Sequence, residues 1–95
     1  MTTPARRRKP SVVLYKADGC HLCDRAREQL ARLRRELEFD LEEVSIDGDA
    51  ELEARYRELI PVVEIGGERA FIYHVHEDAF RRKLGAQTPA RPAGL

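Results

Sequence analysis

The chain contains two cysteines with two residues between them, in the run Cys20-His21-Leu22-Cys23. A short apolar run precedes them and a segment with helical periodicity follows, so the pair should lie at the first turn of a helix. There the first sulfur meets unpaired backbone N–H groups and the positive end of the helix dipole, which favour the thiolate. The second cysteine follows within one turn and can attack a mixed disulfide on the first. This spacing therefore predicts a pair that passes two electrons to or from a partner disulfide.

His21 directly follows the first cysteine. A nearby imidazolium would stabilise the Cys20 thiolate and so make the pair more oxidising. The alternative is a solvent-facing histidine that merely fills the position. Under the first interpretation, His21→Ala should move the thiolate titration of Cys20 to higher pH.

A second possible use of the cysteines is metal binding. His74 and His76 lie two residues apart, so on a strand they would face one way, and with both cysteines they would make a four-ligand zinc set. The spacing is not that of a known zinc module, which favours another interpretation. In that interpretation residues 73–75 leave the sheet, His76 merely precedes the last helix, and Val75 packs on Phe80.

The composition predicts one folded domain between two tails. Residues 1–10 hold a run of basic residues flanked by prolines, and residues 86–95 hold two prolines and almost no large apolar side chain. Both should be disordered. Residues 11–85 should form the domain, and they contain all 17 acidic but 12 of the 17 basic residues, a net charge of −5. Such a domain should repel nucleic-acid phosphates, so nucleic acid is not an expected partner.

The basic tail, residues 1–10, is expected to be solvated, since no aromatic residue or amphipathic helix accompanies its charges. The apolar run Val12–Tyr15 that follows is shorter than the roughly 7 or more apolar residues that a secretory signal needs. No segment is long enough to span a bilayer. We therefore expect no membrane partner and a cytoplasmic location, where thiols are kept reduced and a static structural disulfide is disfavoured.

Hydrophobic periodicity predicts seven elements in the order β-α-β-α-β-β-α. In chain order they are residues 11–15, 21–37, 41–46, 50–58, 62–65, 69–73 and 77–84. Two strand-helix-strand steps predict right-handed crossovers and parallel pairing of the early strands. Gly66 and Gly67 then supply the two-residue turn of an antiparallel hairpin. The expected fold class is therefore α/β, a four-stranded mixed sheet flanked by helices.

Several local signals refine these elements. The first helix has an apolar stripe that should face inward, made of Leu22, Ala26, Leu30, Leu33 and Leu37. The alternation of the second strand slips, which indicates a bulge or a late start. Asp47 and Asp49 offer capping side chains for the second helix, and Gly85 is placed to cap the last one. Tyr15 and Tyr56 are interpreted as core or half-core aromatics.

The element order, the Cys-x-x-Cys after the first strand and the Ile60-Pro61-Val62 before the hairpin together resemble the thioredoxin fold in its smallest, glutaredoxin-like form. The resemblance covers residues 11–85. The chain is similar to the small bacterial glutaredoxin-like proteins. Their landmarks are matched here by Leu14-Tyr15, Gly19–Asp24, Asp47–Tyr56 and Ile60–Val62. Landmarks in the correct order and spacing make the resemblance specific.

The resemblance implies a thiol-disulfide oxidoreductase that needs no cofactor and exchanges its dithiol with protein or small-molecule disulfides. It implies that Cys20 is the exposed nucleophile, that Cys23 is the more buried resolving thiol, and that Pro61 is a cis-proline facing them. The Ile60 N–H and C=O would pair with an extended substrate strand. The residues expected to contact substrate are His21, Leu22, Ile60 and Pro61.

The sequence departs from the glutaredoxin pattern at its glutathione-binding positions. Ala17 stands where that pattern has a lysine, with Lys16 shifted by one, and Leu59 replaces a polar residue two before the proline. His74–Asp78 replaces the Gly-Gly-x-Asp of the last helix. The reductant therefore stays open between glutathione and a reductase, such as a thioredoxin-reductase-like flavoprotein or another dithiol protein. The competing function is a non-catalytic module whose cysteines bind a metal or an iron–sulfur cluster, or act as a redox switch.

Overall fold

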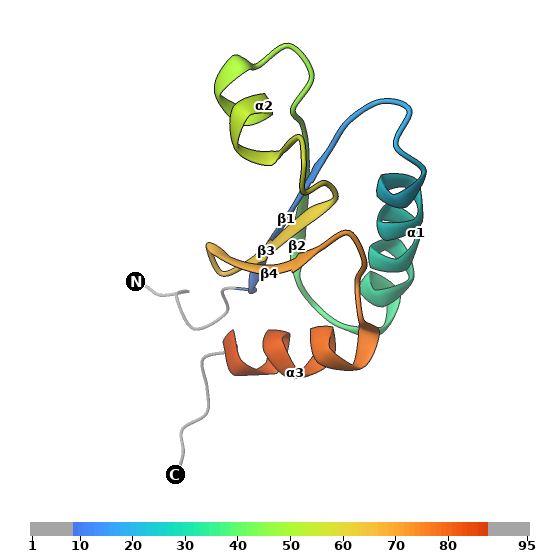
Figure 1. Cartoon of the computed structure of the whole chain (residues 1–95). Helices are drawn as coiled ribbons and strands as arrows, with labels where there is room; N and C mark the ends of the chain where they lie inside the picture. Colours follow the sequence, from blue (N-terminus) through green and yellow to red (C-terminus); the bar gives the residue numbers. More distant parts are fainter. Residues whose placement is uncertain (1–8, 88–95) are drawn as a thin grey trace, which may run out of the picture.

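Seven elements follow one another in the predicted β-α-β-α-β-β-α order (Figure 1). The structure, a computed structural model, describes residues 9–87. Its elements are β1 (Ser11–Lys16), α1 (His21–Glu36), β2 (Asp40–Ser45), α2 (Ala50–Tyr56), β3 (Val62–Ile65), β4 (Glu68–Ile72) and α3 (Glu77–Gln87). Residues 1–8 and 88–95, most of the two predicted tails, lie outside the described part of the chain. The predicted α/β class is confirmed.

The four strands form one mixed sheet in the order β2-β1-β3-β4. β1 runs parallel to β2, as predicted, with Ser11 beside Asp40. β3 is antiparallel to β1, with Tyr15 beside Val62, so the predicted parallel pairing is wrong for the third strand. The length of α2 explains the difference. Its seven residues span about 10 Å, against about 20 Å for the six residues of β2, so α2 alone does not carry the chain back along the sheet, and β3 begins at the end where β2 stops.

β3 and β4 form the predicted antiparallel hairpin around Gly66 and Gly67. Both glycines have positive φ angles, 62° and 84°, which a tight two-residue turn requires and which other residues rarely adopt. The pairing register shifts between Val63 and Glu64, so a bulge interrupts the hairpin.

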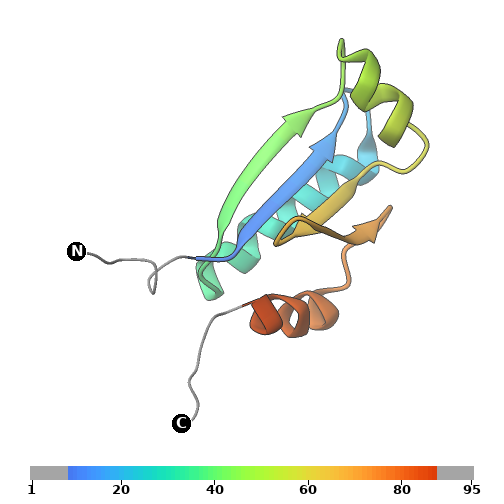
Figure 2. The same ribbon diagram turned by 90° about the vertical axis from the view of Figure 1, so that its left-hand side faces the viewer.

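α1 and α3 bury the main core against one face of the sheet, and Figure 2 shows α1 running behind the strands. The buried side chains of this core are Val12, Leu14, Ala26, Leu30, Leu33, Phe39, Val63, Ile65, Phe71, Val75, Phe80 and Leu84. The rings of Phe39 and Phe80 meet edge to face, with centroids 5.3 Å apart. Removal of this apolar surface from water is the main force that holds α1 and α3 on the sheet.

Ion pairs join the exposed sides of α1 and α3. The guanidinium of Arg81 donates two hydrogen bonds to the Glu36 carboxylate, at 2.7 and 3.0 Å. These bonds lower the pKa of Glu36. Arg32 donates to Glu77 at 2.8 Å. Both ion pairs are exposed, so they add little to the stability that the shared core provides.

α2 packs on the opposite face of the sheet from α1 and α3. Tyr15 points to that face because neighbouring residues of a strand point to opposite sides, and Leu14 points to the main core. Tyr15 of β1 stacks on Tyr56 of α2, with ring centroids 4.3 Å apart, and the Tyr56 hydroxyl donates to Glu64 at 3.1 Å. Tyr56 is buried and Tyr15 is half-buried, which confirms both as core or half-core aromatics. Burial, followed by the bond to Glu64, raises the pKa of Tyr56.

The structure corrects three local predictions. Leu22, predicted to face inward, is 36% exposed. The buried residue before Ala26 is Cys23, three residues away, and not Leu22, four residues away. Gly85 lies inside α3, which continues to Gln87, and it lacks the positive φ of a capping glycine. β2 pairs with β1 in unbroken register, so its slipped alternation is not a bulge. The slip arises because the two buried residues at its ends, Phe39 and Ile46, lie outside the strand.

Candidate active site

Four segments of the chain meet at one end of the sheet, at the top of Figure 1. β1 ends at Lys16, whose carbonyl accepts a hydrogen bond from the Ile46 N–H at 2.8 Å. β3 begins at Val62 beside Tyr15, and Ile72, the last residue of β4, pairs with Val62. The segment that leads to the cysteines, the loop after β2, the Ile60-Pro61 peptide and the segment after β4 are therefore neighbours.

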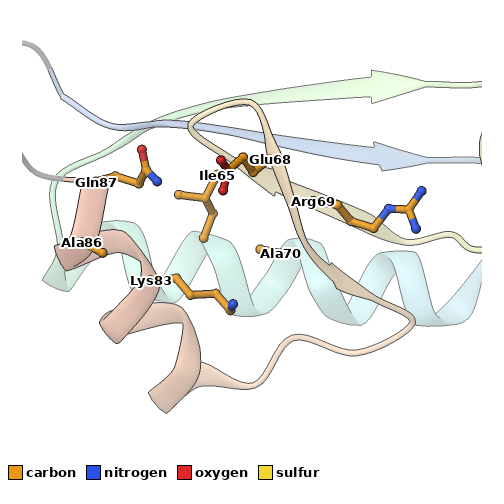
Figure 3. Close-up of a pocket in the computed structure, with 7 residues that line it drawn as sticks. All are labelled: Ile65, Glu68, Arg69, Ala70, Lys83, Ala86 and Gln87. Atoms are coloured by element: carbon orange, nitrogen blue, oxygen red, sulfur yellow. The ribbon is translucent and has the colours of Figure 1, made fainter.

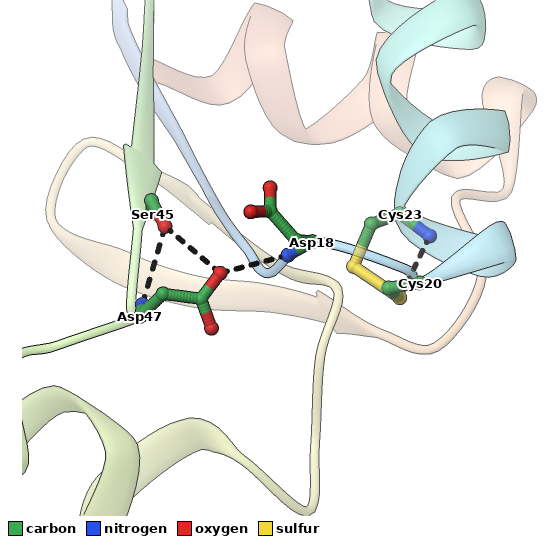
Figure 4. Close-up of a disulfide and its surroundings, with 5 residues drawn as sticks. All are labelled: Asp18, Cys20, Cys23, Ser45 and Asp47. Atoms are coloured by element: carbon green, nitrogen blue, oxygen red, sulfur yellow. Dashed lines mark hydrogen bonds between the residues drawn. A yellow bond between two sulfur atoms is a disulfide. The ribbon is translucent and has the colours of Figure 1, made fainter.

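Cys20 is the N-cap residue of α1 (Figure 4). Its backbone is extended, with φ −100° and ψ 106°, and its Sγ accepts a hydrogen bond from the Cys23 N–H at 3.1 Å. The Cys20 carbonyl accepts the first helical bond, from the Asp24 N–H at 3.1 Å. Gly19, with φ 74°, makes the turn from β1 that allows this entry. The predicted placement of the first sulfur at the start of the helix is confirmed.

The two cysteines form a disulfide, with their Cα atoms 5.1 Å apart. Cys23 is 2% exposed and belongs to the buried side of α1, whereas Cys20 is partly exposed. His21 and Leu22, the two residues between them, are both exposed. A partner can therefore approach Cys20 and the two intervening side chains, but not Cys23.

Asp47 ties the segment before Cys20 to the loop after β2 (Figure 4). Its carboxylate accepts hydrogen bonds from the Asp18 N–H at 2.8 Å and from the Ser45 hydroxyl at 3.4 Å, and it pairs with Arg57 at 3.7 Å. The capping role predicted for this region belongs to Asp49, whose Oδ1 accepts the first amides of α2. An aspartate at a strand end indicates a turn, and nothing in the sequence pairs Asp47 with Asp18.

The Ile60-Pro61 peptide bond is cis, as the resemblance implies. Pro61 is buried and Ile60 is half-buried. The Ile60 N–H donates to the Tyr56 carbonyl at 3.0 Å, so the prediction that it pairs with substrate differs from this structure. Ile60 follows α2 closely enough for its amide to close the last turn. Within residues 9–87, no donor bonds to the Ile60 carbonyl.

Tyr73 faces this peptide from the end of β4. Its N–H donates to the Pro61 carbonyl at 2.9 Å, and its hydroxyl donates to the Glu58 carbonyl at 2.8 Å. It is 42% exposed, and it is the one residue other than glycine in the described chain with a positive φ, 69°. Sequence reasoning does not single it out, because a tyrosine at the end of a strand is ordinary.

Residues 11–85 match the family model described as "Glutaredoxin-like domain (DUF836)". The chain belongs to this family. A mycobacterial relative, the uncharacterized protein Rv0508 of Mycobacterium tuberculosis, is 33% identical over 89 residues, which cover 88% of this chain and 92% of the relative. The solution structure of protein Ne2328 from Nitrosomonas europaea is similar to this glutaredoxin-like chain with a TM-score of 0.71 and 27% identity. That match covers 88% of this chain and 99% of the other.

The glutaredoxin-like domain has the thioredoxin fold. A mutant thioredoxin from Halobacterium salinarum matches it with a TM-score of 0.66, over 92% of this chain and 81% of that one. The identity is 17%, so this likeness concerns the fold alone. A cysteine pair at the start of α1 on such a fold supports a redox-type function.

The two histidines considered as zinc ligands lie in the segment between β4 and α3 of the glutaredoxin-like domain. His74 and His76 are exposed, and Val75 between them packs in the same core as Phe80. The interpretation that this segment leaves the sheet before the last helix is confirmed. Within residues 9–87, no group of three or more His, Cys, Asp or Glu side chains is placed to hold a metal ion, so the four-ligand set is not assembled.

A shallow pocket lies at the other end of the sheet, between the hairpin and α3 (Figure 3). Its volume is about 170 Å³, and it is lined by Ile65, Glu68, Arg69, Ala70, Lys83, Ala86 and Gln87. None of these residues belongs to the cysteine end of the glutaredoxin-like domain.

No helix of residues 9–87 combines the length and the apolar character needed to cross a bilayer.

Proposed function

We propose that this protein is a thiol-disulfide oxidoreductase that exchanges its Cys20/Cys23 pair with protein or small-molecule disulfides. The observation that carries the proposal is the asymmetry of the pair. Cys20 is accessible and caps α1, and its Sγ accepts a hydrogen bond from the Cys23 N–H. Cys23 is buried one turn into the helix. A sulfur at a helix N-terminus is stabilised as the thiolate, the form that attacks disulfides. The arrangement therefore separates an attacking cysteine from a resolving one.

In the reducing direction, the Cys20 thiolate attacks one sulfur of the partner disulfide. The partner S–S bond breaks, a Cys20–partner S–S bond forms, and the departing thiolate takes up a proton. The Cys23 thiol then loses its proton and attacks Cys20 Sγ, which breaks the mixed disulfide and releases the second partner thiol. Two electrons pass from the protein to the partner. One proton comes from the Cys23 thiol and the other from solvent, to which Cys20 lost its own on ionising, and the protein ends in the disulfide form. The oxidising direction is the reverse.

The Ile60 carbonyl is the proposed docking group for a substrate backbone. It lies at the cysteine end of the sheet and has no donor within residues 9–87. An extended substrate segment would donate an N–H to it, while the exposed His21 and Leu22 contact the residues around the substrate cysteine. Val62 pairs with Tyr15, so this peptide lies beside the end of β1.

Electrons would come from glutathione or from a reductase with its own dithiol, and the proposed compartment is the cytoplasm. Lys16 is the lysine nearest the glutathione-binding position of glutaredoxins. It forms an ion pair with Glu43 at 3.2 Å, so its charge is already matched by a carboxylate of this chain. Regeneration of the dithiol by glutathione alone, compared with regeneration by a thioredoxin reductase system, identifies the class of reductant.

A trapping experiment tests the function. The reduced full-length Cys23→Ser variant should form a stable mixed disulfide with a peptide disulfide, detected by mass, because the resolving thiol is missing. The matched Cys20→Ser variant should form none, because Cys23 is buried. Equal trapping by both variants, or trapping by Cys20→Ser alone, contradicts the assignment of roles.

A further inference from the structure

We propose that Tyr73 is a positioning residue for substrate docking, which holds the Glu58–Pro61 segment so that the Ile60 carbonyl presents a fixed acceptor. The inference rests on the proposed function and adds a residue that the cysteine motif does not contain. It starts from two hydrogen bonds made by one residue. The Tyr73 N–H donates to the Pro61 carbonyl, and its hydroxyl donates to the Glu58 carbonyl.

These two bonds bracket the docking peptide. Glu58 lies two residues before Ile60, and Pro61 lies directly after it. The segment leaves α2 through a tight turn in which the Leu59 and Ile60 amides both donate to the Tyr56 carbonyl, at 2.8 and 3.0 Å. Tyr73 thus adds two hydrogen bonds, from just beyond the end of β4, to a stretch that is otherwise fixed by its own turn and by apolar packing of Leu59 and Ile60.

The backbone of Tyr73 shows that the position is unusual. Its φ of 69° lies in the left-handed region, which is strained for a bulky residue and favours glycine. This conformation follows directly after the last residue of β4, where the chain turns away from the sheet. A conformation of this kind persists where surrounding contacts impose it, and the two bonds to the docking segment are such contacts.

The tyrosine also remains accessible. It is 42% exposed, and with Leu22 it is one of the two exposed large hydrophobic residues in the described chain. A ring buried for stability would lose this exposure. The hydroxyl therefore donates its hydrogen bond to the backbone of the docking segment. The ring borders the surface that an extended substrate would approach.

The test compares two variants of the full chain that lose the same group. Tyr73→Phe removes the bond to the Glu58 carbonyl, and Tyr56→Phe removes a tyrosine hydroxyl that bonds to the Glu64 side chain instead. Each reduced protein is mixed with an excess of either a short cystine-bridged peptide or hydroxyethyl disulfide. The limiting rate and the half-saturating concentration of oxidation are measured. Amide hydrogen exchange at Leu59 and Ile60 is measured in parallel.

Tyr73→Phe should raise the half-saturating peptide concentration about fivefold, with the limiting rate unchanged, because one neutral hydrogen bond is lost from the segment that binds the peptide. Its reaction with hydroxyethyl disulfide should stay at the wild-type rate, since that molecule has no peptide backbone. Exchange at Leu59 and Ile60 should become faster. Tyr56→Phe should leave the peptide reaction unchanged, and its exchange at these two amides should rise by no more than its loss of folding stability, measured by urea unfolding, accounts for.

Two results would overturn the positioning role. One is a Tyr73→Phe variant whose half-saturating peptide concentration equals that of the wild type, whether or not amide exchange at Leu59 and Ile60 is faster. The other is an equal slowing of both disulfides, which would show a loss of thiol reactivity rather than of docking. If the wild-type protein oxidises with neither disulfide, the proposed function itself fails, and faster exchange at Ile60 would then describe a purely structural contact. The two failures are therefore distinguishable.

Discussion

The Cys20 Sγ atom accepts a hydrogen bond from the backbone N–H of Cys23, the residue to which it is also joined by a disulfide. The bond is part of the helix cap, so it depends on the position of Cys20 at the start of α1 rather than on the disulfide. In the dithiol form we expect the same N–H to face the Cys20 thiolate, and hydrogen bonds to charged acceptors are the stronger ones. We therefore expect the helix start that orders the oxidised pair to stabilise the Cys20 thiolate as well.

His21→Ala should move the thiolate titration of Cys20 to higher pH, if the imidazolium next to the sulfur stabilises the thiolate. The shift should be modest because His21 is exposed, and solvent screens its charge. The measurement is the ultraviolet absorbance of the thiolate in a Cys23→Ser background. His74→Ala, which removes an exposed histidine outside the motif, is the control. An unchanged titration in His21→Ala would show that the side chain merely fills the position.

Asp47→Ala should accelerate hydrogen exchange of the Asp18 amide about fivefold, because the acceptor that holds the segment before Cys20 is lost. Asp47→Asn keeps a side-chain oxygen and should preserve most of the protection. Asp49→Ala is the matched control, and it should accelerate exchange at Glu51 and Leu52 instead. Protection of Asp18 that survives Asp47→Ala would rule out the tether.

The raised pKa of Tyr56 gives the folding stability a dependence on alkaline pH. Burial favours the neutral phenol in the folded state, so this stability is fully present below the ordinary value of 10.0 and is lost as pH rises through the higher folded value. Tyr56→Phe should cost about 0.5 to 1.5 kcal/mol near neutral pH through loss of the bond to Glu64. The difference in unfolding free energy between wild type and Tyr56→Phe should become smaller at about pH 11, because the wild type loses this contribution there.

Urea unfolding of wild type and Tyr56→Phe at both pH values measures the two gaps. Phenylalanine does not ionise, so the variant lacks this contribution, while the remaining tyrosines and lysines titrate in both proteins. A constant gap between wild type and variant would contradict a raised pKa at this position.

The sequence predicts the features that depend on neighbours along the chain. The stripe Ala26-Leu30-Leu33 repeats with the period of a helix and the glycine pair marks the hairpin. The position of the cysteines directly before that stripe places them at the N-cap and in the first turn of α1. Each of these signals is local, so the element order and the cysteine site follow from it. Leu22 fits the same period and is nevertheless exposed, because the period defines a stripe but not its edge.

The features that escape prediction depend on partners far apart in the chain. Asp18 and Asp47 are separated by 29 residues, and Tyr73 lies 15 residues from the carbonyl that its hydroxyl bonds. The direction of β3 depends on where α2 returns the chain. The bond from the Ile60 amide to Tyr56 is local by contrast, but it depends on where α2 ends, which the sequence pattern predicts two residues later. The long-range contacts are set by tertiary geometry, for which composition and periodicity contain no signal.

A redox titration of metal-analysed, full-length protein tests the central claim most directly. The protein is equilibrated in buffers of defined potential and scored by the mass shift of thiol alkylation, with Cys23→Ser as the control. We predict a reversible two-electron transition between about −270 and −120 mV, the range of working oxidoreductases, and no intramolecular transition in the variant. Thiols blocked by stoichiometric metal, or a pair that forms no disulfide at any potential, would contradict the account and favour a binding module of the same fold.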